Sequence, residues 1–501
     1  MVALSPMLVQ AYDFEYGGLY YNIVSSTDFT AEVAQTSIKE YQGDIIIPTT
    51  VVYNADTYTV VSIEEYAFSW NNLTSVVIPN SVTQMGYGVF GCCENLVSVT
   101  LPEGITVIED YMFEDCLSLT SITIPAGVKT IGKGAFSGSG LTSITIPNSV
   151  ETIESGAFSG TNLTSVFIPQ NAYFDSAPFS GCTKMQEITV SADNPYFTSI
   201  DGVLFGKGKK KLIQYPAGKT GNAYIVPTGV THIGNEAFYG CALSSIVLPN
   251  SVEEIGWGAF SSSDVARVNI PDKVTTIKAD CFEGCWNLKS FVIPSNVTEI
   301  GECAFYDAGL TSITIPKSVT NLVGYAFGEC LDLTSVIISC ISAINSSFFN
   351  CSNLATVTFT EDVEVVGAGL FSGCDNIRIV SVGATLPPII EDGTFSETVE
   401  SRARLKVRPG CKSAFESSLY WSDFTNIVED ASAQTVSIHS EPVQVYAQNG
   451  NIEIVGAENE AVTVYNADGR EVYRGYGRSI PVSAKGLYIV KIATSSYKVV
   501  L

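Results

Sequence analysis

Histidine is almost absent from this sequence, whose 501 residues include only His232 and His439. The sequence therefore has too few histidines for a zinc site built on several of them, and few candidates for the histidine of a Ser–His–Asp triad. The GxxxxGK[ST], HExxH and GxSxG motifs, which mark phosphate loops, zinc proteases and serine nucleophiles, are also missing. We accordingly predict no catalytic residue, no metal and no cofactor, and expect the chain not to be an enzyme.

Basic residues are scarce as well. The chain has 26 lysines and arginines against 51 aspartates and glutamates, which gives a formal net charge of −25. Phosphate backbones and anionic lipid headgroups repel such a chain, so we expect no nucleic-acid partner. The one basic cluster, Lys207 with Lys209, Lys210 and Lys211, lies among glycines. We interpret it as a solvated turn rather than an anion site.

Long apolar runs are missing too, since no stretch approaches the roughly 18 residues that a membrane-spanning helix needs. We expect no membrane span. Residues 1–11, MVALSPMLVQA, are an apolar run that ends in small-residue spacing. This resembles the second half of a secretory signal peptide cleaved after Ala11, without the positive segment that should precede it. We predict a signal-peptide remnant at 1–11 and a secreted or cell-surface protein.

What the sequence does contain is an internal repeat marked by one phenylalanine. Except for a long gap after Phe179, successive members of the series are 21 to 24 residues apart. Each repeat carries the phrase Leu-x-x-Ile/Val-x-Ile/Leu-Pro, then a valine, an isoleucine and the phenylalanine. The series is Phe68, Phe90, Phe113, Phe136, Phe158, Phe179, Phe238, Phe260, Phe282, Phe305, Phe327, Phe348, Phe371 and Phe395. A period kept over more than 300 residues indicates a repeat architecture.

The repeat phrase has the spacing of a short strand. Leu119, Ile122 and Ile124 would place alternate side chains in a core, and the proline that follows withholds an amide donor. A single strand cannot bury itself, so neighbouring repeats must stack as a parallel sheet, with Val128 and Phe136 filling the interior. We predict a mainly β solenoid of roughly fourteen coils, with loops and 3₁₀ turns on the convex return arms.

Two segments interrupt the repeat. Near residues 192–221, DNPYFTSIDGVLF and LIQYPAG flank the lysine-rich tip, and we predict a β-hairpin insert that projects from the solenoid. A smaller hairpin from Val51 opens the array and is expected to shield the first coil. The predicted organisation is a cap segment at 12–43, the solenoid at 44–430, and a separate domain at 431–501.

The phrases SIDGVLF and I-P-x-x-V-x-x-I-x-x-x-A-F resemble the BspA-type leucine-rich repeat of bacterial surface proteins, over about Asp44 to Glu429. The resemblance implies a curved right-handed solenoid and extracellular recognition, often adhesion to host or partner surfaces. It does not supply a ligand.

Beyond residue 430 the period stops. YNADGREVYRG from Tyr465, GLYIVKI from Gly486 and KVVL from Lys498 alternate apolar and polar residues around turns, which predicts a small antiparallel β-sandwich. These phrases are similar to the C-terminal sorting domain of the type IX secretion system of Bacteroidetes. That similarity implies export across an outer membrane, while an ordinary Ig-like stalk module remains the alternative.

The thirteen cysteines follow the repeat rather than pairing geometry. Eight of them stand three residues after a repeat phenylalanine: Cys93, Cys116, Cys182, Cys241, Cys285, Cys330, Cys351 and Cys374. Ser139 and Thr161 occupy the same position in other repeats. We predict a column of buried thiols acting as small hydrophobic groups, in preference to disulfides.

The third and fifth residues of each strand phrase should face the concave side of the solenoid. They are mostly Ser and Thr, so this side is expected to be rich in hydroxyls and nearly uncharged, with the acidic residues on turns, arms and ends. Apolar or charged residues that break the rows are our candidate ligand surface. They are Val77, Phe167, Glu187, Val247, Arg267, Val292 and Ile337. Alternatively, Ser and Thr occur in these rows only because small hydroxyl residues stack well in a tight sheet. The insert near Tyr196 to Tyr215 is a second candidate contact surface.

These features predict a secreted or cell-surface recognition and adhesion protein, monomeric as a solenoid, that binds an extracellular protein or glycan. One alternative is a structural surface-layer or self-assembling component. Another is a carbohydrate-active enzyme with an unrecognised pair of carboxylates, which would have to converge at about 5 to 9 Å.

Overall fold

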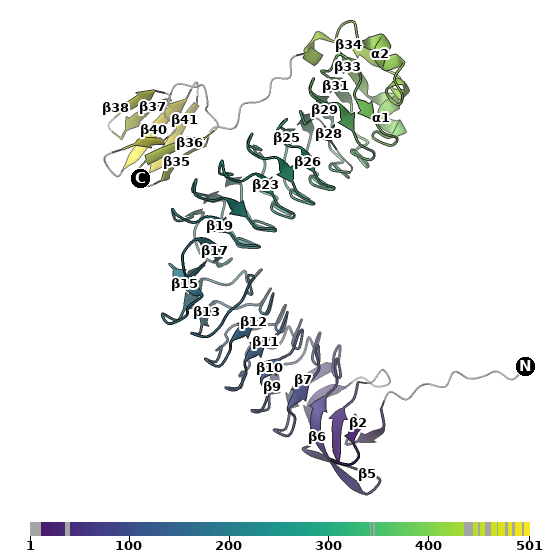
Figure 1. Ribbon diagram of the computed structural model, residues 1–501, viewed down its shortest axis with the longest axis vertical. Helices are drawn as coiled ribbons and strands as arrows, with labels where there is room; N and C mark the ends of the chain where they lie inside the picture. Colours follow the sequence, from purple (N-terminus) through teal and green to yellow (C-terminus); the bar gives the residue numbers. More distant parts are fainter. Residues whose placement is uncertain are drawn as a thin grey trace, which may run out of the picture. The chain divides into compact units, whose positions relative to one another are not determined.

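The computed structural model describes residues 12–35, 41–340, 342–343 and 346–434, and seven shorter stretches nearer the C-terminus (444–448, 451–455, 462–467, 469–475, 479–482, 486–492 and 495–500) (Figure 1). The predicted signal-peptide remnant at 1–11 lies outside these residues. The chain forms two compact units. Unit 1 comprises Met1–Leu288 and Ile300–Ala308, and unit 2 comprises Lys289–Glu299 and Gly309–Leu501. In each unit, stacked coils are built on parallel strands, which confirms the predicted mainly β solenoid.

Strands of the repeat phrase, with the strands that pair with them at either end, form what we call the first ladder. Its members in unit 1 are β4 (Gln42–Ile46), β7 (Asn72–Val77), β9 (Ser98–Thr100), β13 (Ser165–Ile168), β14 (Glu187–Val190), β18 (Ala223–Ile225), β20 (Ser245–Val247) and β22 (Arg267–Val268). In unit 2 they are β25 (Ser312–Ile315), β27 (Ser335–Ile338), β29 (Thr356–Phe359), β31 (Ile379–Val382), β33 (Arg404–Val407) and β34 (Ile427–Glu429). Pairing within the ladder is parallel.

Side-chain alternation explains why these segments are strands. In β13, Val166 and Ile168 are buried, whereas Ser165 and Phe167 are exposed. The register pairs Val166 with Ile188 of β14, so equivalent positions of successive coils lie side by side. Each inward β-branched side chain therefore packs on its counterpart in the next coil.

Three repeats depart from the expectation of one strand per repeat. The phrases that begin at Leu119, Leu141 and Leu288 keep these leucines buried but form no assigned strand. Thr142 N still donates to Thr120 O at 3.0 Å, so the coils of the first two phrases remain in contact. The alternation of apolar and polar residues determines which side chains point inward. Backbone hydrogen bonding between strands depends instead on the spacing between coils, which the sequence pattern does not determine.

A second parallel ladder, which we did not predict, runs through the return arms. Its strands form at the isoleucine that follows the repeat valine, where Ile108 and Ile131 point inward and are fully buried. They are β8 (Gln84–Met85), β10 (Val107–Ile108), β11 (Thr130–Ile131), β12 (Thr152–Ile153), β17 (Lys211–Gln214), β19 (His232–Ile233), β21 (Glu254–Ile255), β23 (Thr276–Ile277), β24 (Glu299–Ile300), β26 (Asn321–Leu322), β28 (Ser342–Ala343), β30 (Val365–Val366) and β32 (Ile389–Ile390). The rest of each arm consists mainly of turns, and the 3₁₀ helices of the described chain lie instead at η1 (Trp421–Asp423) and η2 (Ala431–Gln434).

The repeat phenylalanines form stacks inside each unit. In unit 1 one stack runs from Phe68 to Phe179 and another from Phe238 to Phe305, and in unit 2 a stack runs from Phe327 to Phe395. In unit 1 the rings of Phe68 and Phe90 are 5.6 Å apart with an interplanar angle of 4°, and those of Phe136 and Phe158 are 5.3 Å apart at 8°. Backbone bonds repeat with the rings, because Phe136 N donates to Ala157 O at 2.8 Å. In unit 2, the rings of Phe348 and Phe371 are 5.6 Å apart. One buried ring per coil thus provides both packing and spacing.

The predicted column of buried thiols is confirmed. All thirteen cysteines are thiols rather than disulfides, and the eight that follow a repeat phenylalanine are buried. Cys93 Sγ donates to Phe68 O at 3.0 Å, and Cys374 Sγ donates to Phe348 O at 3.0 Å, so each thiol contacts the preceding coil. Burial raises the pKa of the Cys182 thiol to about 11. The Cys182 thiol therefore stays neutral, and it also donates to Phe158 O at 3.1 Å, next to the phenylalanine stack.

The insert packs into the array, so the prediction that it projects from the solenoid is wrong. Strands β15 (Phe197–Ile200) and β16 (Val203–Gly206) form an antiparallel hairpin, but β17 pairs in parallel with β19 of the next coil. Leu204 is fully buried because the apolar run of the insert supplies core. Tyr215 takes the place of a repeat phenylalanine, with its ring 5.6 Å from that of Phe238 and its N–H donating to Ala237 O at 2.8 Å.

A separate sheet covers the first coil. Its order is β1-β2-β3-β6-β5, from β1 (Phe14–Tyr16), β2 (Leu19–Ser25), β3 (Thr30–Val33), β5 (Thr50–Tyr53) and β6 (Asp56–Ile63). Asn54 and Ala55 have φ of 49° and 71°, as a tight hairpin turn between β5 and β6 requires. The ring of Tyr41 lies 5.2 Å from that of Phe68 at 57°, so a tilted tyrosine begins the stack.

Helices, which we did not predict, close the last coil. They are α1 (Glu397–Arg402) and α2 (Lys412–Glu416), with η1 following. The Phe424 ring meets Phe395 at 5.3 Å and 81°, so the last stacked ring packs against an edge rather than a face. Trp421 is fully buried beside them, and its Nε1 donates to Pro388 O at 2.7 Å. The perpendicular ring of Phe424 and the indole of Trp421 therefore end the stack, because neither presents a ring face on which another coil would have to pack.

The described strands from residue 444 onward form two antiparallel sheets, of order β35-β36-β39 and β38-β37-β40-β41. They are β35 (Gln444–Gln448), β36 (Asn451–Val455), β37 (Val462–Asn466), β38 (Glu471–Gly475), β39 (Ser479–Pro481), β40 (Leu487–Ile492) and β41 (Ser495–Val500). Ile452 from the first sheet and Val464 and Val490 from the second share one core. This is the small antiparallel sandwich that the alternation predicts.

Removing one ring from the stack should be costly. Phe136→Ala leaves a cavity between two rings, so the free energy of unfolding should fall by about 3 to 5 kcal/mol. Urea unfolding followed by fluorescence measures this. Ser139→Ala is the matched control in the same coil, because the buried Ser139 hydroxyl has no hydrogen-bond partner and its loss should not lower stability. A Phe136→Ala loss no larger than that of the control would refute the role of the stack.

Candidate ligand-binding surface

The outward side of the first ladder, which we call the first-ladder face, is ordered in rows. The register pairs Ser75 with Ser98 and Val77 with Thr100. It pairs Ser165 with Glu187 in the same way. Third and fifth positions of the repeat phrase therefore lie in two parallel rows, as the sequence predicts, wherever the ladder is continuous.

All seven candidate residues lie outward. Phe167 and Val77 are 51% and 41% exposed, Glu187 and Arg267 are also exposed, and Val247, Val292 and Ile337 are half-buried. The structure does not unite them in one site. They fall into small groups along the face, and Val292 and Ile337 belong to unit 2.

One of these groups combines an aromatic ring with a charge. Phe167 on β13 lies opposite Thr189 on β14, and Glu187 is two residues before Thr189. Such diagonal neighbours on adjacent strands are within reach of an aromatic side chain. Glu187 also abuts the insert, because a Cβ on Gly202 would lie 2.8 Å from the Glu187 Cβ. The insert and the most exposed candidate aromatic residue are therefore close together.

Two exposed apolar partners were missed by the sequence analysis. Ile46 on β4 lies opposite Val77 and is 74% exposed. Ile225 on β18 lies opposite Val247 and is 50% exposed. Ile46 and Ile225 belong to coils that lack the full repeat phrase. The only sequence signal for their outward position was the alternation of inward and outward residues along a strand.

The rule that the fifth residue of each strand phrase faces outward fails at Asn269. This residue is buried, and β22 ends at Val268. Its Oδ1 accepts from Leu248 N at 2.8 Å, and its Nδ2 donates to Leu248 O at 2.8 Å. The side-chain amide thus satisfies backbone groups at a point where the ladder has stopped.

The face carries few charges in unit 1 and more at its end in unit 2. Asp44 Oδ1 accepts from Ser75 Oγ at 2.6 Å and from Thr74 Oγ1 at 2.7 Å, and these hydroxyls lower the pKa of the Asp44 carboxyl. On β33, by contrast, Arg404 and Lys406 both point outward. The expectation of a nearly uncharged face therefore fails at β33.

Ion pairs hold part of this basic strand. Lys406 Nζ lies 3.0 Å from Asp430 Oδ2, and Arg408 lies 2.6 Å from Glu361 Oε2. Hydrogen bonds from Ser432, together with Lys406, lower the pKa of Asp430 to about 2. In the sequence, basic residues alternate with other residues in RARLKVR. This alternation indicated a charged outward row, and our sequence analysis did not use it.

The insert presents a second aromatic surface. Tyr173 and Tyr196 are 40% and 47% exposed, and their rings meet at 5.0 Å and 64°. Below them Asn194 is fully buried, where its Nδ2 donates to Pro169 O at 2.8 Å and its Oδ1 accepts from Tyr196 N at 2.8 Å. The tip from Lys207 to Lys211 is exposed, as expected of a solvated turn.

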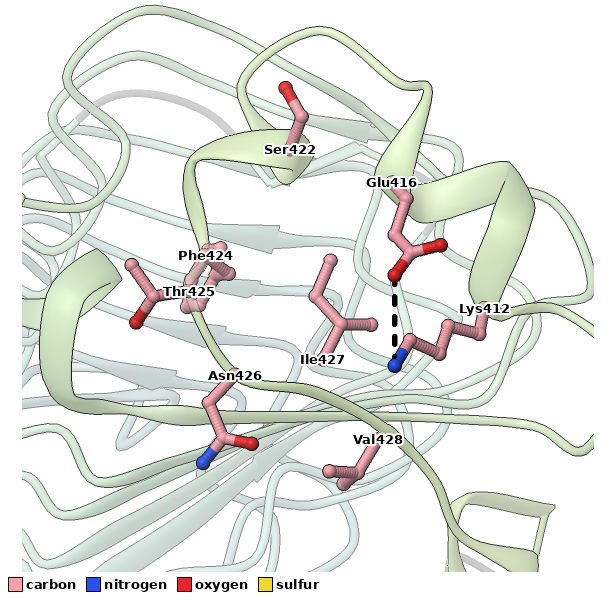
Figure 2. Close-up of a pocket in the computed structure, with 8 residues that line it drawn as sticks. All are labelled: Lys412, Glu416, Ser422, Phe424, Thr425, Asn426, Ile427 and Val428. Atoms are coloured by element: carbon pink, nitrogen blue, oxygen red, sulfur yellow. Dashed lines mark ion pairs between the residues drawn. The ribbon is translucent and has the colours of Figure 1, made fainter.

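A cavity of about 400 Å³ lies in the last coil, between α2 and β34 (Figure 2). Its walls are formed by Lys412, Glu416, Ser422, Phe424, Thr425, Asn426, Ile427 and Val428. Glu416 is its only carboxylate and lies 3.6 Å from Lys412 Nζ. In the described part of the chain no Asp or Glu side chain is buried, and no three potential metal ligands converge.

Within the described residues, no helix is long and apolar enough to cross a membrane. Parallel coils of 21 to 24 residues with one leucine-led strand phrase define a leucine-rich repeat protein. Residues 61–186, 218–334 and 275–401 match, in six copies, the family described as the BspA type leucine rich repeat region. The chain belongs to this family.

Solved structures agree with this assignment. A leucine-rich cell surface protein from Faecalibacterium prausnitzii A2-165 is 26% identical, with a TM-score of 0.51, and the match covers 73% of this chain and 93% of that one. The pneumococcal vaccine antigen PcpA is 20% identical, with a TM-score of 0.52, over 83% of this chain and 98% of that one, which shows the shared fold alone. No curated protein matches this chain.

Asn269 can be tested as a backbone clamp. Asn269→Ala leaves Leu248 N–H and C=O without their partner, so the free energy of unfolding should fall by about 1 to 3 kcal/mol. Asn287→Ala is the control, because the exposed Asn287 amide makes a single side-chain bond, to Asp264 Oδ1 at 3.2 Å. Equal stability of the two variants in urea unfolding would contradict the assignment.

Proposed function

We propose that this chain is a secreted or cell-surface recognition protein that binds an extracellular protein or glycan through the first-ladder face. Family membership supports a surface role, as does the similarity to a protein described as a leucine-rich cell surface protein. The proposed contact residues are the seven candidates, Val77, Phe167, Glu187, Val247, Arg267, Val292 and Ile337. The exposed partners Ile46 and Ile225 extend the groups around Val77 and Val247.

The observation that carries the proposal is the position of Phe167. Its ring is 51% exposed in a row whose neighbour on β14 is the hydroxyl residue Thr189. Because Phe167 is already half-buried, covering the rest of its side chain with a ligand is worth about half of the value for full burial, or about 1 kcal/mol. Hydroxyls beside an apolar ring can donate to and accept from a sugar or a peptide backbone, so the group suits a glycan or an extended protein segment.

The C-terminal sandwich is the basis of a second proposal, export by the type IX secretion route. Support comes from the phrases at Tyr465, Gly486 and Lys498 and from the antiparallel sandwich built by the described strands. In this role residues 431–501 direct the chain outward and are then removed or anchored. An Ig-like stalk would share the sandwich without that processing.

Binding through the face can be tested with matched variants. Immobilised extracellular-matrix proteins and a glycan array are screened with the full chain, with Phe167→Ala and Arg267→Ala, and with Trp70→Ala as control. Trp70 is 77% exposed but lies in the turn before β7. We expect saturable binding that Phe167→Ala weakens by roughly four- to tenfold, since 1.4 kcal/mol is a factor of ten, and that Trp70→Ala leaves unchanged.

Other results would redirect the assignment. Equal binding by Phe167→Ala and the parent would move the contact to the insert around Tyr196 or to the return arms. Absence of any binding would argue against the recognition function.

Processing is tested separately on the native protein. Intact-mass and peptide mass spectrometry should find a mature chain without Met1, beginning after Ala11, and lacking or modified within residues 431–501. A mature chain that retains Met1 would refute the signal-peptide remnant. An unmodified C-terminus ending at Leu501 would favour the stalk over the sorting domain.

A further inference from the structure

Exposed tyrosines on two adjacent coils of unit 1 form what we call the tyrosine corner. Tyr66 and Tyr87 are 40% and 42% exposed, and their rings are 4.9 Å apart at an angle of 79°. Tyr66 N donates to Tyr87 O at 3.0 Å, so the two residues also adjoin through the backbone. Each lies in the turn before a repeat phenylalanine and not on a strand of the first ladder. Two nearly perpendicular aromatic rings are therefore open to solvent outside the first-ladder face.

Both rings of the tyrosine corner are held in place. A Cβ on Gly88 would lie 2.4 Å from the Tyr66 ring, so this ring packs directly on the backbone of the next coil. The Tyr87 hydroxyl is hydrogen-bonded to the Glu65 carboxylate, and this bond raises the pKa of Tyr87. Because the rings are already fixed, little side-chain entropy is lost when a ligand binds them.

The chemistry of the tyrosine corner favours a cation. The faces of tyrosine rings attract positive charge, and the Glu65 carboxylate lies beside them. In the described part of the chain no ion pair involves Glu65. Residues 41–128 contain ten aspartates and glutamates and no lysine or arginine, so the surrounding coils supply no positive charge of their own.

An equivalent position two coils further along already binds a lysine. Tyr111 is two residues before its repeat phenylalanine, as Tyr66 is, and its ring likewise lies against a glycine, Gly134. Lys133 from the next coil places its Nζ 5.8 Å from the centre of the Tyr111 ring. In the coil after Tyr66, the residue at the position of Lys133 is Tyr87. The chain thus provides Tyr111 with an ammonium group and, among the described residues, provides none to Tyr66.

A second tyrosine pair, in the insert, is less suited to an external cation. The rings of Tyr173 and Tyr196 are 5.0 Å apart, and the Tyr173 hydroxyl donates to Asp175. However, Lys207 N donates to Tyr196 O at 2.7 Å, and Lys207 Nζ donates to Ala192 O at 3.1 Å. A lysine of the chain is therefore already present beside this pair.

We propose that the tyrosine corner, with Glu65, binds a lysine or arginine side chain of a basic partner protein. The ammonium or guanidinium group lies against the two rings, as Lys133 lies over Tyr111, and pairs with the Glu65 carboxylate. The net charge of −25 attracts such a partner from a distance and raises its concentration near the protein. This contact is separate from the first-ladder face and does not depend on binding there.

A lysine peptide tests the site. Fluorescently labelled octalysine, titrated with the full chain and followed by anisotropy, should bind saturably, and its fully acetylated form should not bind. Tyr66→Leu and Tyr87→Leu should each weaken binding by roughly two- to fivefold, the range for one exposed cation–π contact. Glu65→Gln should weaken it as well. Glu103→Gln, which makes the same charge change in the turn after β9, should leave the affinity at the parent value.

Fluorine resonances of a chain labelled with 3-fluorotyrosine locate the binding. The two resonances that Tyr66→Leu and Tyr87→Leu remove should shift during the octalysine titration, and circular dichroism confirms that the variants are folded. Tyr87→Phe, which keeps the ring, should retain most of the affinity. Equal affinity of the parent and both leucine variants would mean that net charge alone attracts the peptide and would overturn the proposal. Absence of binding, or Tyr66 and Tyr87 resonances that do not shift, would overturn it too.

Discussion

The stacking of one phenylalanine per repeat is the interaction on which the rest of this structure depends. Ring centroids in the stacks are separated by distances such as 5.6 Å between Phe68 and Phe90 and 5.2 Å between Phe327 and Phe348. These values are close to the spacing of paired strands, so both ladders can form on the same coils. Where the repeat is interrupted, Tyr215 supplies the ring. Where it ends, Phe424 meets the stack edge-on.

Close approach between coils then restricts the residues beside the stack. Gly134 has φ of 57°, and a Cβ there would lie 2.7 Å from the Tyr111 ring of the preceding coil. Gly88 has the same relation to Tyr66. At these two positions glycine follows a large side chain, because the ring covers the space that a Cβ would need. The column of thiols obeys the same limit, since only a small group fits between stacked coils and still reaches a carbonyl oxygen.

A solenoid held together by inward side chains leaves its outward side chains free to vary. Outward residues of the first-ladder face can therefore reflect ligand binding, but they can also reflect packing within the sheet. Most of its residues are hydroxyls that a tight sheet accepts for packing reasons alone. Phe167 and the apolar pair of Ile46 with Val77 are different, because no packing requirement explains an exposed apolar side chain there. Among the described strands, β4 and β34 each pair with one neighbour and are the outermost strands of the ladder.

The sequence by itself determined the repeat, the strand phrase, the inward residues and the buried thiols, because each depends on local alternation and on a period that chance does not produce. It could not determine the second ladder, the loss of strand pairing near Leu119, the packed insert or the inward turn of Asn269, since these depend on distances between coils. The seven candidate residues were correctly placed outward by alternation. Their separation into small groups, and the exposed partners Ile46 and Ile225, were decided by inter-strand register, which only the tertiary structure fixes.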